Sequence, residues 1–297
     1  MISFDEFLRA VCENIPEYLI QYDIEKVQTE EIRKNNGVIR TGLIISVKDE
    51  NISPNIYMEY YYDLLKEGNS LEDIYGFIRD EYNMARKTSY IDISMIGKEM
   101  IMNNVFLKLV NYERNKDELM ETPHILFLDL AVTFRYYVKK EEGTIASALI
   151  KNSDMVRYDI SFEELKERAF DNTKIQFPTK MIRIDELLKD YMSTNVLPDN
   201  NMLYVLSNDI GVNGATAMLY SEKIRELACE LNSNLYILPS SIHEVLLLSD
   251  KCEMNVGEIK NMVEDVNRYV VSDMDYLSDE VYFYDINRDA ITYNLLD

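Results

Sequence analysis

The segment from Leu238 to Glu244 carries the residue types of a nucleophile, a base and an orienting carboxylate. It contains Ser240, Ser241 and His243, and a hydroxyl activated by an imidazole is one basis of acyl-transfer catalysis. In an extended segment Ser241 and His243 share a face about 6.5 Å apart, too far for a direct hydrogen bond. No G-x-S-x-G elbow exposes either serine. The spacing therefore predicts no catalytic residue and favours a tight turn between two strands.

The same turn is the best candidate for a ligand-binding site. Pro239 cannot donate to a strand ladder and should end its strand, and His243 is one of only two histidines. A structural turn would use the serines and the imidazole to bond its own backbone, whereas a binding turn would place them beside a pocket. The side chains that such a ligand would contact come from this turn and the preceding hairpin: Ser240, Ser241, His243, Asn213, Tyr204 and Asn208.

Metal and cofactor motifs are weak throughout the chain. His124 and His243 do not form an H-x-x-x-H pair, so the usual zinc ligands are missing. The acidic run from Asp273 to Glu280 lacks the glycine and the terminal glutamate spacing of an EF-hand loop, which favours a solvated acidic loop. The loop from Gly211 to Gly214 lacks the lysine of a P-loop and the third glycine of a dinucleotide fingerprint. We expect a β-turn there, and neither a metal nor a cofactor in the protein.

Charge excludes some classes of partner. The 297 residues include 31 Lys and Arg against 53 Asp and Glu, a net charge of −22. Such a chain repels polyphosphates and anionic bilayers, so we expect no nucleic-acid and no membrane binding. No apolar run approaches the ~20 residues of a membrane span. The first residues of the chain are acidic, whereas a signal peptide begins with basic residues. The spacing of Cys12, Cys229 and Cys252 matches neither a metal-binding motif nor a redox motif. These features predict a cytoplasmic protein with free thiols.

Three classes of function remain open. The lack of catalytic spacing favours a non-enzymatic binding or regulatory protein that acts through protein contacts. A carboxylate-based hydrolase is the enzyme alternative, because many acidic residues could form a pair that a sequence does not reveal. An acidic nucleic-acid mimic is the third, because the segment from Ser272 to Asp285 carries five acids and no base. The oligomeric state is not indicated.

Residues 1–92 are expected to form a helix, hairpin, helix, helix subdomain. Ser3 and Glu6 predict a capping box for a helix over 3–14, after which Pro16 breaks the pattern. Asn36-Gly37 predicts a type I′ turn between strands 24–34 and 38–48, the first of them a solvated edge strand. Ser53-Pro54 predicts a helix start, and Ser70 with Asp73 opens the next helix.

Residues 93–297 are expected to form a larger domain, although 91–123 show no clear pattern and leave the boundary uncertain. One strand is predicted over 125–138, with Asp129 and Arg135 on its polar face, and a second over 144–150. Helices are predicted over 161–172 and 221–231 and from Asn255 onward. The remaining predicted strands pair as hairpins: 203–207 with 215–220, 235–238 with 244–248, and 281–286 with 291–295. We therefore predict an α+β fold of mixed or antiparallel sheets, built from hairpins that alternate with capped helices on one face.

Four stretches in combination resemble a known family. They are Asn35-Asn36-Gly37-Val38 with Thr41-Gly42-Leu43, the run from Asn51 to Glu59, the run from Leu203 to Asn208 with Asn213-Gly214-Ala215, and the run from Tyr236 to Val245. The chain resembles an uncharacterised family of Firmicutes proteins, domain of unknown function 5688, over most of its length. The resemblance implies a bacterial, cytoplasmic origin. It implies no activity, so no catalytic residue is carried over.

Overall fold

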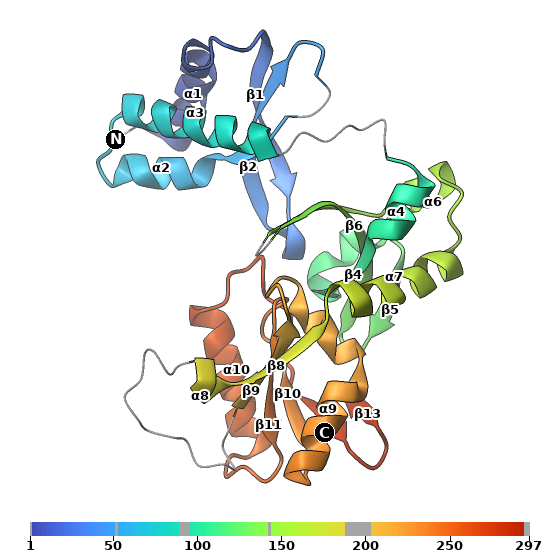
Figure 1. Cartoon of the computed structure of the whole chain (residues 1–297). Helices are drawn as coiled ribbons and strands as arrows, with labels where there is room; N and C mark the ends of the chain where they lie inside the picture. Colours follow the sequence, from blue (N-terminus) through green and yellow to red (C-terminus); the bar gives the residue numbers. More distant parts are fainter. Residues whose placement is uncertain (1, 51–52, 89–95, 142–143, 188–202, 294–297) are drawn as a thin grey trace. The chain divides into compact units, whose positions relative to one another are not determined.

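The chain forms two compact units, Met1–Ile96 and Gly97–Asp297. The computed structural model describes residues 2–50, 53–88, 96–141, 144–187 and 203–293 (Figure 1). The boundary expected between residues 92 and 93 lies outside these described residues. Within the described part of the chain, no helix is long and apolar enough to cross a membrane.

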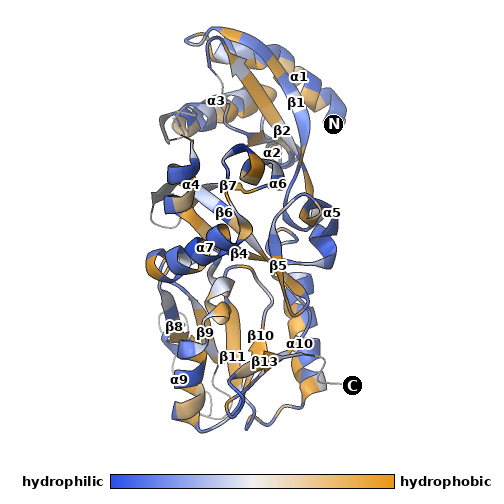
Figure 2. Ribbon diagram, turned by 90° about the vertical axis from the view of Figure 1, so that its right-hand side faces the viewer, coloured by the Kyte–Doolittle hydropathy of each residue, from blue (hydrophilic) through white to orange (hydrophobic). Residues whose placement is uncertain are grey.

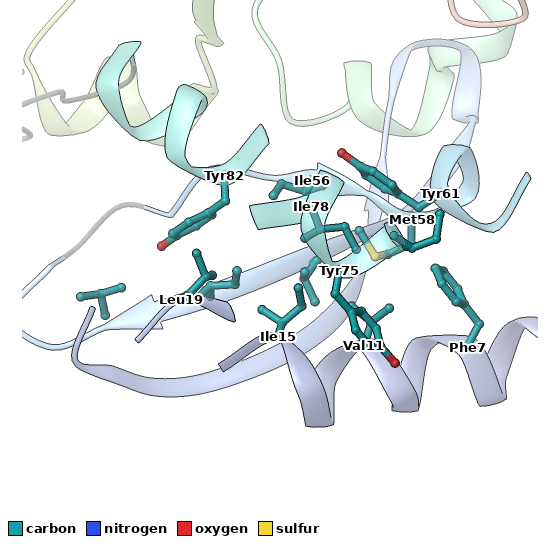
Figure 3. Packing of buried hydrophobic residues seen from close by; sticks show 14 residues of the cluster. Phe7, Val11, Ile15, Leu19, Ile56, Met58, Tyr61, Tyr75, Ile78 and Tyr82 are labelled. Carbon is teal, nitrogen blue, oxygen red and sulfur yellow. The ribbon is translucent and has the colours of Figure 1, made fainter. Parts of the chain in front are cut away.

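The first unit is a three-stranded antiparallel sheet with helices packed on one face. Its sheet order is β1-β2-β3. Side chains of α1, β2, α2 and α3 form one core, in which Phe7, Ile15, Leu43 and Tyr82 are fully buried (Figure 3). The elements in chain order are α1 (Phe4–Tyr18), β1 (Ile24–Arg33), η1 (Asn35–Gly37), β2 (Ile39–Val47), β3 (Ile56–Tyr57), α2 (Met58–Lys66) and α3 (Leu71–Thr88).

Short sequence motifs determine the backbone in the first half of this unit. The Ser3–Glu6 capping box is present, and α1 then continues through Pro16 to Tyr18 rather than ending before the proline. Asn36 (φ 60°, ψ 24°) and Gly37 (φ 71°) are both left-handed, and Val38 N–H donates to Asn35 O at 3.4 Å. That geometry is the expected type I′ turn. No residue of β1 is buried, which fits the expected solvated edge strand.

The expected helix start at Ser53-Pro54 is wrong, because residues 53–59 cover the second edge of β2. Ser53 Oγ accepts a hydrogen bond from Ile45 N–H at 3.2 Å, and Glu59 Oε1 accepts one from Thr41 N–H at 2.6 Å. Between them β3 pairs with Gly42 and Leu43. The extended backbone that this pairing requires delays the helix until Met58.

The second unit contains two antiparallel sheets. In the four-stranded sheet β6 pairs with β4, β5 and β7, and the six-stranded sheet has the order β13-β12-β10-β11-β9-β8. The elements up to residue 187 are α4 (Lys98–Asn104), β4 (Val105–Asn111), η3 (Glu113–Asn115), α5 (Lys116–Leu119), β5 (His124–Phe127), β6 (Leu130–Glu141), β7 (Thr144–Leu149), α6 (Asn152–Arg157), α7 (Phe162–Gln176), β8 (Thr179–Arg183) and α8 (Ile184–Leu187). From residue 203 they are β9 (Leu203–Asn208), η5 (Gly214–Leu219), α9 (Ser221–Leu231), β10 (Leu235–Leu238), β11 (Val245–Ser249), α10 (Val256–Tyr269), β12 (Tyr282–Asp285) and β13 (Ala290–Thr292).

The α+β class is confirmed, and the six-stranded sheet carries helices on both faces. Ile259 and Val263 of α10 pack with Leu238 and Leu248. Helix α9 lies on the other side of the sheet, so that apolar strands stand between the two helices (Figures 1 and 2). Helices therefore lie on both faces of this sheet rather than on the one face expected from the sequence.

Two predicted strands take other forms. The strand expected over 125–138 is a hairpin, because Phe127 pairs with Leu130 and Leu128 (φ 58°) lies in the two-residue turn between them. Apolar residues continue to alternate with other residues through this turn, so the sequence pattern does not reveal the turn. The strand expected over 215–220 is the 3-10 helix η5. Both edges of β9 are already taken, by β8 and β11, so the sheet has no place for another strand beside β9.

Asp129, in the β5–β6 turn, links the two sheets of the second unit. Its carboxylate accepts hydrogen bonds from Ser278 Oγ at 2.6 Å and from Tyr282 Oη at 2.5 Å. Tyr282 belongs to the six-stranded sheet and is fully buried. Burial, reinforced by the charge of Asp129, raises the pKa of Tyr282 well above its ordinary value. The neutral hydroxyl therefore persists in the folded protein.

The Tyr282→Phe variant should be less stable than the parent chain at pH 8 and should lose less stability at alkaline pH. At pH 8 it lacks a hydrogen bond to a carboxylate, worth about 1.5–3 kcal/mol. Above pH ~10 an unfolded tyrosine ionises while folded Tyr282 keeps its proton, so the parent's unfolding free energy falls as pH rises. Urea unfolding at several pH values from 8 to 11 measures both effects. Tyr269→Phe, at an exposed ring, is the control, and parallel pH curves for parent and Tyr282→Phe would contradict this assignment.

Candidate functional site

The turn around His243 is held by backbone pairing with a segment about 35 residues later. Ser278 N–H and Leu277 N–H donate to Pro239 O and Ser240 O, both at 3.0 Å. Ile242 N–H donates to Asp275 O at 2.8 Å. Residues 239–242 therefore continue a ladder with residues 275–278 after β10 ends. Sequence reasoning found the turn but missed this partner segment, because no local pattern indicates a pairing at such a separation.

The imidazole of His243 is bonded at both nitrogens. Asn213 N–H donates to Nδ1 at 3.3 Å, and Nε2 lies 3.2 Å from Asp275 Oδ1. Because Nδ1 must accept, the proton of the neutral ring sits on Nε2 and is donated to Asp275. The second oxygen of Asp275 accepts from Ser272 Oγ at 2.7 Å. The ring therefore has no free nitrogen with which to activate a nucleophile.

Two serine hydroxyls beside His243 bond to its backbone rather than to the imidazole. Ser241 Oγ, in the turn, accepts from His243 N–H at 3.0 Å, and Ser207 Oγ, on β9, donates to His243 O at 2.7 Å. Ser240 is partly exposed, and its carbonyl is held by Leu277. This is the turn chemistry that the sequence favoured over a nucleophile and base.

The residues expected from the preceding segment divide into two groups. Asn213 reaches His243 through its backbone, and Asn208 holds the loop by accepting from Gly211 N–H and donating to Val212 O, both at 2.8 Å. Tyr204 lies opposite Leu247 in the ladder, two positions before the Leu206–Val245 pair that adjoins the turn. The structure thus brings Asn213 to His243 and leaves Tyr204 further along β9.

Gly214 marks a very close approach of the loop to the turn. A Cβ at this position would lie 2.4 Å from His243 O and 2.8 Å from Asn208 N. Both contacts are with backbone, which cannot rotate away. Glycine is therefore required for the loop to reach the imidazole.

The five acids of the segment from Ser272 to Asp285 all have partners within the chain. These pairs are Asp273 with Arg114, Asp275 with His243, Asp279 with Asn267, Glu280 with Lys260, and Asp285 with the backbone N–H of Asn287. Within the described residues, no group of three or more His, Cys, Asp and Glu side chains is arranged to hold a metal ion. The acidic side chains of this segment therefore bond to other groups of the second unit.

Replacing His243 by alanine should lower the unfolding free energy by about 1–2 kcal/mol, because two hydrogen bonds of the ring are lost. Chemical denaturation monitored by circular dichroism measures the change. Ser240→Ala keeps the carbonyl that Leu277 binds and should stay within about 0.5 kcal/mol of the parent. An unchanged stability for His243→Ala would show that the ring does not hold the turn.

Gly214→Ala should destabilise the protein by more than about 2 kcal/mol, because its methyl group meets backbone at under 3 Å. Gly76→Ala is the matched control. Its Cβ would meet nothing within 4 Å in the middle of α3, so alanine should add about 0.5–1 kcal/mol of stability. Thermal unfolding of both variants tests the contrast, and similar melting temperatures would argue against the close approach at Gly214.

Comparison with known proteins gives a family and no named relative. No curated protein and no solved structure matches the chain. The model of a family of unknown function, DUF5688, matches residues 4–286, which include both units and the turn around His243. The chain therefore belongs to this family of unknown function.

Proposed function

We propose that this protein is a non-enzymatic binding or regulatory protein that acts through contacts with another protein. The observation that carries the proposal is the bonding at His243, where both ring nitrogens and the neighbouring serine hydroxyls are engaged by the chain itself. A general base needs a nitrogen within hydrogen-bond reach of a nucleophile. The turn lacks that arrangement, because its polar side chains bond to other groups of the chain.

The end of α10 supplies the apolar part of the proposed binding surface. Val266, Tyr269 and Val270 are 36%, 76% and 77% exposed and follow one another at helical spacing. We call these three residues the α10 stripe. Exposed apolar groups that gather at one place are typical of protein contact sites, whereas isolated ones are not. The stripe ends two residues before Ser272, where the loop that binds His243 begins.

Charge favours a basic partner. Asp265 and Asp273 are exposed and lie close to the α10 stripe in sequence; Arg268 lies within the stripe's span, and Arg114 contacts Asp273 at 3.8 Å. The net charge of −22 adds a long-range attraction for positively charged proteins. The occupant that fits the stripe is therefore a basic amphipathic helix of another protein, with apolar residues on one face.

The two alternative functions have less support. A carboxylate-based hydrolase needs two convergent, available carboxylates, but Asp129 accepts from Ser278 and Tyr282, and Asp279 accepts from Asn267. A nucleic-acid mimic needs acids that are free to replace phosphates, whereas those of the segment from Ser272 to Asp285 have partners within the chain. The unpaired thiols support a reducing, cytoplasmic compartment, and a bacterial origin rests only on the resemblance to the family.

Binding of a designed peptide tests the α10 stripe. An amphipathic helix of about 18 residues made of Leu and Lys should bind the parent chain, and its Leu and Glu counterpart should not. Replacing Tyr269 and Val270 together by serine should weaken binding at least about tenfold, or ~1.4 kcal/mol. Val156→Ser, at an 84% exposed apolar residue of α6, is the matched control. Isothermal titration calorimetry gives the dissociation constants.

Two results would overturn the proposal. Equal binding of the basic and acidic peptides, or equal binding by the stripe variant and the control, would exclude the α10 stripe as the contact site. Turnover in a broad screen of ester, amide, phosphate and glycoside substrates would exclude the non-enzymatic role, provided that Asp129→Asn or Asp279→Asn abolished it.

A further inference from the structure

Arg135 is a partly buried cation that has no carboxylate partner among the described residues. It lies on β6 and donates from Nε to Ser147 Oγ and from Nη2 to Ser147 O, both at 3.1 Å. Burial lowers the pKa of Arg135 from its ordinary value, and the charge of Glu118 acts in the opposite direction. The guanidinium remains charged because its pKa starts so high. The groups that hydrogen-bond Arg135 are both neutral, which is costly for a partly buried charge.

Donors remain available at this position. Within the described part of the chain, Nη1 of Arg135 makes no hydrogen bond and is not fully buried. Ser147 Oγ accepts from Arg135, which leaves the hydroxyl hydrogen available as a donor. Two kinds of donor are therefore available beside one positive charge.

An aromatic ring lies next to the guanidinium. Tyr137 is two residues along β6 from Arg135, on the same face of the strand, and pairs with Ser147 across the sheet. The Tyr137 ring is partly exposed and packs edge-on against Phe177, which also contacts Phe106. Burial raises the pKa of Tyr137, so its hydroxyl keeps its proton. The ring is thus held in place beside the free donors.

We propose that Arg135, Ser147 and Tyr137 form a binding site for a small aromatic carboxylate. The carboxylate accepts from Nη1 of Arg135 and from the Ser147 hydroxyl, and the ligand ring packs on Tyr137. A monoanion matches the single cation of the site. A phosphate dianion would leave excess negative charge in a strongly acidic protein. This site is independent of the α10 stripe.

Benzoate and its neutral isostere benzamide are suitable probes. We expect benzoate to shift the amide resonances of residues 135–137 and 147–149 saturably in nitrogen–proton correlation spectra at constant ionic strength. Benzamide should bind at least about tenfold more weakly, because it lacks the charge that pairs with Arg135. Acetate should also bind more weakly than benzoate, because it has no ring to pack on Tyr137.

Variants separate the binding role of Arg135 from its bonds to Ser147. Arg135→Gln should reduce benzoate affinity at least about tenfold, and Arg135→Lys should recover only part of it, because lysine keeps the charge and loses the planar fork. Arg157→Gln, at an exposed arginine of α6, should bind benzoate as the parent does. Spectra of each free variant confirm that it is folded. Equal binding of benzoate and benzamide, or full affinity in folded Arg135→Gln, would overturn the proposal.

Discussion

The second unit depends on one constraint, the need to satisfy backbone groups where β10 leaves its sheet. Pro239 has no N–H to donate, so the ladder with β11 stops before it. The carbonyls of residues 239, 240, 242 and 243 then receive donors from Ser278, Leu277, Ala215 and Ser207. Three segments far apart in sequence are thereby drawn to one turn. Since buried carbonyls rarely go without a donor, this pairing fixes where the loops on either side must lie.

Backbone groups also decide how each of the two histidines bonds. His243 accepts at Nδ1 from a backbone N–H. His124 differs, because its Nδ1 faces Thr122 O at 2.8 Å and must donate. Sequence alone does not distinguish the two rings, since each is set by a backbone atom that the fold supplies.

Sequence patterns succeeded where a few neighbouring residues determine the backbone. Ser3 with Glu6 and Asn36 with Gly37 act over three residues or fewer, and both form as expected. The Ser53-Pro54 signal failed because Ser53 Oγ bonds to Ile45 N–H on a neighbouring strand. The turn at Asp129 was missed for a different reason, because the apolar alternation continues through it. The pairing of Asp275 with the His243 turn was missed because the two segments lie about 30 residues apart, where no periodicity connects them.

The described sheets leave limited places for function. In the six-stranded sheet, helices cover both faces, and the turn at Pro239–His243 uses its own polar groups. Side chains that the fold does not fully use therefore lie at the end of a helix and on one face of the four-stranded sheet. Tyr269 and Val270 offer apolar surface at the end of α10, and Arg135 offers donors beside β7. A binding protein needs only exposed surface of this kind. A hydrolase needs polar side chains that are not already hydrogen-bonded within the fold. Here the polar groups of the best candidate site hold the scaffold together.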